Sequence, residues 1–247
     1  PYISRTLGAT AVGVYSYTYS VAYYFLLIAM LGIGNHGNRS IAAVRDDRKK
    51  LNKTFSSIYS LQIITFSIAI LAYAIYLVLF VKDNRLIVLL QLIYVTSGLF
   101  DIGWLFFGLE QFKLTVARNT LIKISTVVLM FVFVHKPSDL WKYTLIMSAG
   151  TLFSQAYLWL YVKKYVSFEK CSVKEITSNI KPVLILFIPV LAYSIYKVMD
   201  KMFTFAPLNP KEGKFWADMK CDPDKSAELM ERYNGIRFGP YSDKKHW

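Results

Sequence analysis

Long apolar segments, separated by short basic ones, set the pattern of this sequence. Residues 6–38 and residues 54–81 contain no Lys, Arg, Asp or Glu. A membrane-spanning helix needs about 20 mostly apolar residues, and six segments meet or approach that length: 12–33, 54–81, 86–107, 114–134, 143–162 and 182–198. The pattern predicts an all-α membrane protein, a bundle of about five to six transmembrane helices in which the sixth runs into a soluble tail.

The composition agrees with a membrane protein. Of the 247 residues, 55% are hydrophobic and 18% are charged, whereas a soluble domain has about 45–50% apolar and about 25% charged residues. The net charge is +13, which in a soluble protein would suggest a nucleic-acid partner. Here the bases lie between apolar segments, so we attribute them to control of membrane topology and do not expect nucleic acid as a partner.

Alternate connections between the spans differ strongly in basic residues. Connections 34–55, 109–123 and 163–181 hold fourteen Lys and Arg residues, whereas connections 82–85 and 135–142 hold four. The positive-inside rule therefore predicts that the first set faces the cytoplasm. We expect a multi-pass protein of the cytoplasmic (inner) membrane.

Two of the basic connections carry helical signals. Ile41, Val44, Leu51 and Phe55 fall near one face of a helix, which predicts one short helix lying at the membrane interface. Ser172 and Glu175 have the spacing of a capping box and predict the start of a second helix.

The character of the chain changes near residue 203. Residues 206–213 are rich in Pro and Gly, residues 215–220 alternate like a short strand, and residues 226–233 have the signals of a helix. We therefore divide the chain into a transmembrane part, 1–202, and a short soluble α+β tail, 203–247.

Motifs for catalysis or metal binding are weak. Residues 32–37 match GxGxxG, but they follow an apolar span rather than a strand, so we interpret them as a helix terminus rather than a dinucleotide site. Cys171 and Cys221 have no metal-binding spacing, and His36 and His135 are isolated. The sequence therefore predicts a protein that is not an enzyme and has no cofactor or metal.

Charged residues inside or beside the spans are the candidate functional groups. Asp101 lies deep in the third span, where a lipid-facing carboxylate is costly, so it should face a cavity or a basic partner, for which Lys123 is the candidate. An ion pair that only holds helices together is the alternative. Arg118 either has a functional role or extends to the interface. Arg5 is either an ordinary flank of the first span or a ligand of phosphate at a cavity mouth.

A set of segments carries a resemblance to a known family. They are Pro1-Tyr-Ile-Ser-Arg-Thr-Leu-Gly8, Gly13-Val-Tyr-Ser-Tyr17, Leu31-Gly-Ile-Gly-Asn-His-Gly-Asn-Arg39, Ile41-Ala-Ala-Val-Arg-Asp46 and Asp101-Ile-Gly-Trp-Leu-Phe-Phe-Gly-Leu-Glu110. Together they resemble the N-terminal half of a Wzx-type oligosaccharide flippase, in the multidrug/oligosaccharidyl-lipid/polysaccharide exporter superfamily. The resemblance covers roughly residues 1–202. The tail resembles a fragment of a MmcQ/YjbR-like domain.

The resemblance implies a function. Such proteins have two helical lobes around a cavity and move undecaprenyl-pyrophosphate-linked oligosaccharide, the repeat unit of O-antigen, capsule or exopolysaccharide, across the cytoplasmic membrane by alternating access. The first helix and second lobe of the family are not matched, so we expect an incomplete lobe. Polysaccharide polymerase and glycosyltransferases are candidate partners beside membrane lipids. The alternatives are a drug or metabolite exporter of the same superfamily and a non-transporting membrane scaffold. The candidates for substrate binding or coupling are Arg5, Arg39, Asp101, Arg118 and Lys123.

Overall fold

Helices make up every regular element in the part of the chain that the structure describes. The computed structural model describes residues 2–205, with the backbone alone for residues 195–205. Its elements are α1 (Tyr2–Met30), α2 (Ile33–Val44), α3 (Arg48–Leu79), α4 (Arg85–Ser97), η1 (Gly98–Phe100), α5 (Gly103–Gly108), α6 (Phe112–Phe133), η2 (Pro137–Asp139), α7 (Leu140–Tyr165), α8 (Val173–Ser178) and α9 (Ile180–Phe205). The predicted all-α class is confirmed.

Six stretches are long and apolar enough to cross a membrane. They are Tyr2–Val44, Arg48–Leu79, Arg85–Gly108, Phe112–Phe133, Pro137–Tyr165 and Val173–Ser194. Each of these stretches includes most or all of one of the six apolar segments predicted from the sequence. The chain is therefore a multi-pass membrane protein. The predicted tail elements at 215–220 and 226–233 lie outside the described residues.

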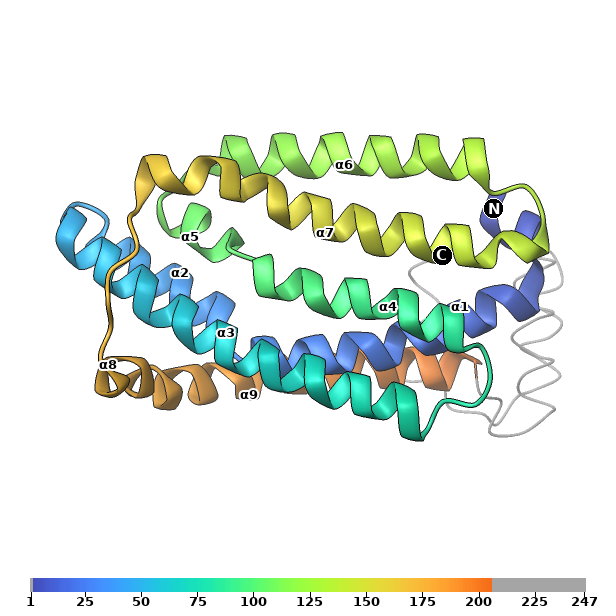
Figure 1. Ribbon diagram of the computed structural model, residues 1–247, viewed down its shortest axis with the longest axis horizontal. Helices are drawn as coiled ribbons and strands as arrows, with labels where there is room; N and C mark the ends of the chain where they lie inside the picture. Colours follow the sequence, from blue (N-terminus) through green and yellow to red (C-terminus); the bar gives the residue numbers. More distant parts are fainter. Residues whose placement is uncertain (1, 206–247) are drawn as a thin grey trace, which may run out of the picture. The chain divides into compact units, whose positions relative to one another are not determined.

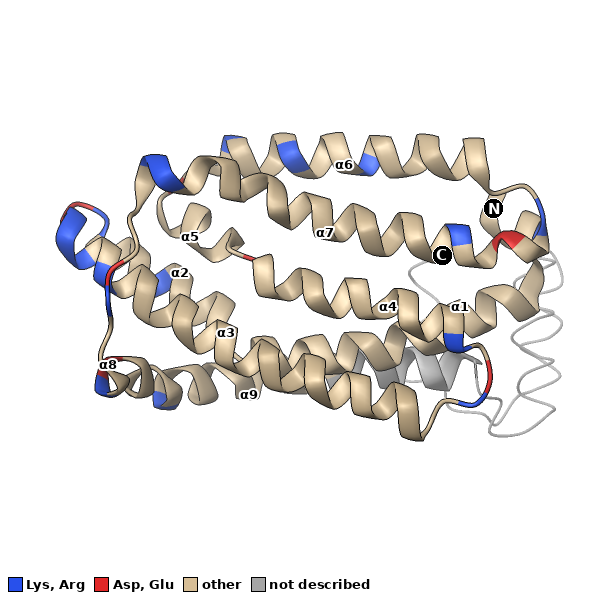
Figure 2. Cartoon of the chain, in the orientation of Figure 1, with Lys and Arg blue, Asp and Glu red and all other residues tan. Residues whose placement is uncertain are grey.

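The chain divides into two compact units, Pro1–Val190 and Leu191–Trp247. In the first unit, α4 and α7 lie side by side, α6 packs against α7, and α1 packs against α3 and α4 (Figure 1). Most charged residues gather at the two ends of these helices; the exceptions are blue segments along α6 and one red segment at the junction of α4 and α5 (Figure 2). Charge at the ends is the distribution that a bilayer-spanning bundle requires, because charge at the bilayer centre is costly.

The segment from Ile41 to Phe55 differs from the prediction. It is not one interfacial helix but the junction of α2 and α3, with a turn at residues 45–47. The Asp47 carboxylate accepts hydrogen bonds from the backbone N–H groups of Lys49 and Lys50, both at 3.1 Å, and so starts a new helix. The predicted shared face is nevertheless real, since Ile41, Leu51 and Phe55 are buried in one core.

Residues 32–37 form a helix junction, as predicted. Helix α1 ends at Met30, and Gly32 is the residue before α2. A Cβ atom on Gly32 would collide with the carbonyl oxygen of Val183 and lie 2.9 Å from the nitrogen of Phe187. The glycine therefore lets the start of α9 approach the α1–α2 junction backbone to backbone.

Candidate functional site

The third span is broken in its second half. Helix α4 gives way to the short helix η1, Asp101 is extended with φ −75° and ψ 96°, and α5 then resumes the path. A break in a membrane span leaves backbone groups without their helical partners, and these must be satisfied inside the protein. Polar side chains from two other spans meet that need.

Gln62 on α3 is the main support of the break. Its amide nitrogen donates to the carbonyl oxygens of Gly98 and Asp101, each at 2.8 Å, and its amide oxygen accepts from the indole N–H of Trp104 at 3.0 Å. Trp159 on α7 donates its indole N–H to the carbonyl oxygen of Phe100 at 2.9 Å. Side chains from α3 and α7 therefore both stabilise the broken segment by hydrogen bonds to its backbone.

The Asp101 side chain is half-buried at this break and binds the first backbone N–H of α5. Its Oδ1 accepts the backbone N–H of Gly103 at 3.0 Å. The pairing of Asp101 with Lys123 is a wrong prediction, because none of the ion pairs within residues 2–205 includes Lys123, whose side chain is exposed. Asp101 takes part in none of these ion pairs either, but Arg118 on α6 lies near enough for its charge to act on the Asp101 carboxylate.

Arg118 lies inside the bundle rather than at its interface. Its side chain, on α6, is 7% exposed, and its guanidinium donates to the side-chain oxygens of Gln155 at 2.8 Å and Asn119 at 3.0 Å and to the backbone oxygen of Ser154 at 3.4 Å. Its Nε is buried and has no hydrogen-bond partner among the described residues. The guanidinium thus joins α6 to α7 and keeps one buried donor without a partner among the described residues.

The other three candidates are exposed. Arg5 precedes a bend in α1 at Gly8, whose φ of 78° lies in the left-handed region. Arg39 is exposed on α2. Lys123 is exposed near the middle of α6, a helix of which little is buried. Of the other four candidates, Arg118 is thus the one whose charge reaches Asp101, without forming an ion pair with it.

A tyrosine cluster was missed by the sequence reasoning. Tyr15 on α1 meets Tyr143 on α7 with ring centroids 4.7 Å apart, and Tyr19 on α1 meets Tyr94 on α4 at 5.0 Å with 3.3 Å between the hydroxyl oxygens. The four-residue spacing of Tyr15, Tyr19 and Tyr23 is a signal that could have found it, because such residues share one helix face. The cluster gives the interior of the bundle polar-tipped aromatic groups from three spans.

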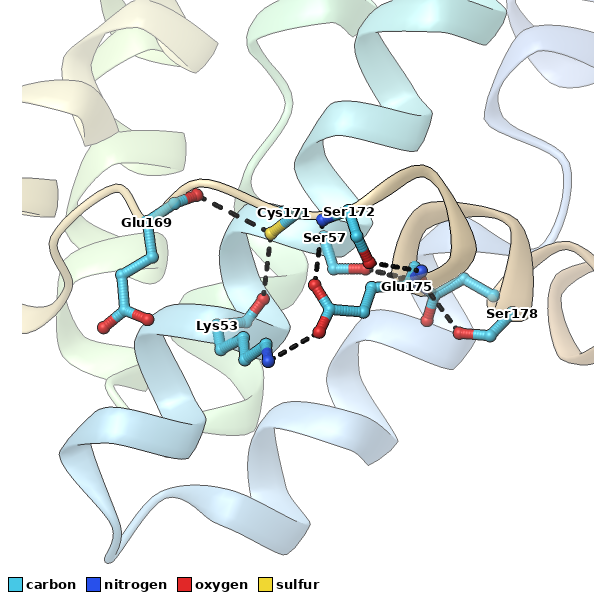
Figure 3. A network of polar contacts seen from close by, with 8 residues as sticks. Lys53, Ser57, Glu169, Cys171, Ser172, Glu175 and Ser178 are labelled. Atoms are coloured by element: carbon cyan, nitrogen blue, oxygen red, sulfur yellow. Dashed lines mark hydrogen bonds and ion pairs between the residues drawn. The ribbon is translucent and has the colours of Figure 1, made fainter.

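At the end with many bases, a polar network ties the α7–α9 connection to α3 (Figure 3). The ammonium of Lys53 lies 2.5 Å from the carboxylate of Glu175, and the hydroxyl of Ser57 donates to the backbone oxygen of Glu175 at 2.9 Å. The predicted capping box of Ser172 and Glu175 is confirmed, with bonds of 3.0 and 3.4 Å. Burial raises the pKa of the Cys171 thiol in this network, which disfavours the reactive thiolate.

An open pocket of 290 Å³ adjoins the network, lined in part by Lys50 and Lys53. Both ammonium groups are paired, Lys50 with Asp47 at 3.1 Å and Lys53 with Glu175. The pocket is therefore less basic than its residue types suggest, and we treat the network as a structural tie. No group of three or more His, Cys, Asp or Glu side chains that could hold a metal occurs within the described residues.

Comparison with known proteins adds the family. A family model described as polysaccharide biosynthesis protein matches residues 1–211. The chain is 24% identical over 201 residues to a putative O-antigen transporter of Shigella dysenteriae, covering 79% of this chain and 50% of the relative. It is 24% identical over 142 residues to a putative O-antigen transporter of Escherichia coli strain K12, covering 57% of this chain and 34% of the relative. The chain thus spans half or less of these relatives, and no solved structure matches it significantly.

Proposed function

Since the chain belongs to the polysaccharide biosynthesis protein family, we propose that it forms one lobe of a flippase that moves lipid-linked oligosaccharide across the cytoplasmic membrane. The two relatives, both putative O-antigen transporters, support a saccharide cargo. The specific substrate in this proposal is an undecaprenyl-pyrophosphate-linked repeat unit of O-antigen, capsule or exopolysaccharide.

The observation that carries the proposal is that two ionisable groups lie within the membrane-spanning helices, the buried Arg118 on α6 and Asp101 at the broken span. Ionisable groups are expensive inside a bilayer and mark substrate or ion pathways. Broken helices are the feature from which many transporters build their sites at membrane depth. A membrane scaffold needs neither, whereas a transporter of a charged lipid uses both.

In this proposal the exposed cations serve the pyrophosphate. Lys123 lies on an exposed face near the middle of α6, where facing lipid would cost about 2.5–3.5 kcal/mol on the insertion scale. That cost favours a cavity or a second lobe in front of Lys123 rather than lipid. Arg39 would meet the substrate at the basic end and Arg5 at the other, since guanidinium groups bind phosphate oxygens in a bidentate way.

The lobe would work by alternating access. Rocking of two lobes around a fixed site exposes the bound headgroup first to one side and then to the other, while the lipid tail stays in the bilayer. Asp101 would provide the charge that is switched, either by changing its electrostatic attraction for Arg118 when substrate binds or by taking up a coupling proton.

The test removes the charge of Asp101 and keeps its hydrogen bond. In a complete protein that carries this lobe, Asp101→Asn retains an oxygen that can accept from the N–H of Gly103. We expect translocation of lipid-linked oligosaccharide to fall about tenfold, as when about 1.4 kcal/mol of barrier stabilisation is lost, with unchanged membrane expression. Asp46→Asn, the same change at an exposed loop position, is the matched control and should translocate normally.

The outcomes separate the alternatives. Normal translocation per molecule with a lowered melting temperature would mean that Asp101 only holds helices together. Export of cationic dyes by cells that fail to assemble surface polysaccharide would favour a drug exporter of the same superfamily. Wild-type protein that does neither would contradict the proposed function.

A further inference from the structure

A second cavity lies at the end of the bundle with few bases, and neither Arg118 nor Asp101 lines it. Its volume is 570 Å³, and its walls come from α1, the end of α3, and the connection that leads into α4. Ligand cavities typically measure about 300–1,000 Å³. The size is therefore right for a small ligand or for one part of a larger one, and none of the five candidate residues lines it.

The walls combine exposed aromatic rings with a polar rim. Tyr17 is 68% exposed and Phe80 is 72% exposed, and the rings of Phe80 and Tyr76 stack with centroids 6.2 Å apart. The rim consists of Lys82 and Asp83, both exposed and both absent from the ion pairs formed within residues 2–205, together with Asn84.

Asn84, the third residue of this rim, has an unusual backbone conformation and a side chain that caps no helix. Its φ of 53° and ψ of 31° are left-handed, a conformation that Asn tolerates better than most residues. Its side chain caps no backbone group of α4. The side-chain amide of Asn84 can therefore both donate and accept hydrogen bonds. The ammonium of Lys82 can donate and the carboxylate of Asp83 can accept.

We propose that this cavity binds the saccharide of the translocated substrate at the low-base side of the membrane, an inference that rests on the proposed function. A sugar ring has an apolar C–H face, which packs on an aromatic ring, and an edge of hydroxyl groups, which need both donors and acceptors. The cavity presents both kinds of surface within one space. An acyl chain would leave the polar rim unused, and a phosphate would meet the carboxylate of Asp83.

Gly13 provides a way to fill the cavity without disturbing the fold. It lies in α1 on the cavity wall, and a Cβ atom built on it meets nothing within 4 Å. Leu is a better helix former than Gly, so Gly13→Leu should fold at least as well as the wild type. Ser16→Leu is the matched control, because Ser16 is exposed on the same helix and does not line the cavity.

The experiment measures binding of defined saccharides to the full 247-residue chain in detergent. The probes are chitobiose and maltose, followed by saturation-transfer NMR, with an acyl-chain detergent analogue as the competing ligand. We expect saturation of the sugar C–H protons with the wild type and with Ser16→Leu, and an affinity lower by about tenfold or more with Gly13→Leu. Tyr17→Ala removes an exposed ring instead of filling space and should weaken binding in the same direction.

Some results would overturn the proposal. They are equal binding by the wild type and Gly13→Leu, no binding of either probe by the wild type, and displacement of the probes by the acyl analogue at equal concentration. A translocation assay on the complete protein distinguishes failure of this proposal from failure of the proposed function. A wild-type protein that translocates while Gly13→Leu translocates equally well overturns the saccharide cavity alone, whereas a wild-type protein that does not translocate contradicts the flippase.

Discussion

Gln62 holds more of the broken span together than any other single side chain, with two carbonyl oxygens and one indole N–H as its partners. The side chain is fully buried. Gln62→Leu leaves the Asp101 carbonyl oxygen and the Trp104 indole N–H unpaired, whereas the Gly98 carbonyl oxygen keeps the backbone N–H of Asp101 at 3.2 Å. Each unpaired buried group costs about 1–3 kcal/mol. We expect a marked drop in the thermal unfolding midpoint in detergent.

Ser60→Ala is the control for Gln62→Leu. The Ser60 hydroxyl bonds only to the Ser56 carbonyl oxygen of its own helix, at 2.7 Å, so its removal should change stability by no more than about 0.5 kcal/mol. Equal midpoints for the wild type and Gln62→Leu would show that water or lipid headgroups satisfy the break instead.

The sequence identified Asp101 but not its surroundings. An acid in an apolar span is visible in any hydropathy plot, whereas Gln62 and Trp159 gain their roles only when distant segments meet. The choice of Lys123 over Arg118 failed for a geometric reason. Five residues correspond to about 140° around an α-helix, so the two side chains cannot face the same neighbour, and α6 turns Arg118 inward.

At the scale of elements, the glycine-rich junction of α1 and α2 can be tested directly. Gly32→Ala would place a Cβ atom against the backbone of Val183 and Phe187, which cannot move aside as a flexible side chain can. Gly34→Ala is the matched control: it is the same substitution two residues further along the chain. Its Cβ atom would meet only the Met30 Cε, at an ordinary contact distance of 3.6 Å.

We expect Gly32→Ala to lower the unfolding midpoint clearly and Gly34→Ala to leave it unchanged or slightly raised, because Ala favours a helix over Gly by up to about 1 kcal/mol. The same loss of stability in both variants would mean that helix propensity, not close approach, governs this junction.

The start of α3 should respond to pH through Asp47. Hydrogen bonds from the backbone N–H and ammonium of Lys50 hold the pKa of Asp47 below its usual range. Because the folded-state pKa lies below the unfolded value of about 3.9, the stabilisation is present above that value and is lost as the pH falls through the folded-state pKa. Amide exchange of Lys49 and Lys50, corrected for intrinsic rates, should therefore lose protection below about pH 4.

Asp47→Asn keeps an acceptor at the cap but cannot titrate. It should show first-turn protection of α3 that does not change with pH over the same range. A pH dependence equal to that of the wild type would place the titrating group elsewhere. The prediction of one interfacial helix missed this cap because hydrophobic periodicity continues across the turn, and the Asp47 signal is local.

At the scale of the whole molecule, the spans were predictable because length and apolarity alone determine them, and the family matches confirm the resemblance to the N-terminal half of an oligosaccharide flippase. The packing of the interior was less predictable from the sequence. The tyrosine cluster, the broken span and the low-base cavity arise where α1, α3, α4 and α7 meet, and a periodic pattern on one helix does not state which neighbour it faces.

The orientation of the chain remains a prediction that labelling can test. The charge asymmetry of the connections predicts the α2–α3 turn and the α7–α8 connection in the cytoplasm and the α3–α4 and α6–α7 connections outside. The predicted connection 109–123 was too long, because α6 begins at Phe112 and contains its three bases. The connections 34–55 and 163–181 still hold eleven Lys and Arg residues, so the asymmetry remains. In a background without native cysteines, single cysteines replace exposed residues at each place: Lys50, Lys170, Lys82 and Ser138. An impermeant thiol reagent applied to intact cells should label positions 82 and 138 and leave 50 and 170 unlabelled until the cells are permeabilised.

Because the lysines removed at 50 and 170 are a small part of the basic excess, the substitutions should not invert the protein. The opposite labelling pattern would reverse the orientation and would place the low-base cavity on the cytoplasmic side, where it would receive the saccharide before translocation rather than after it.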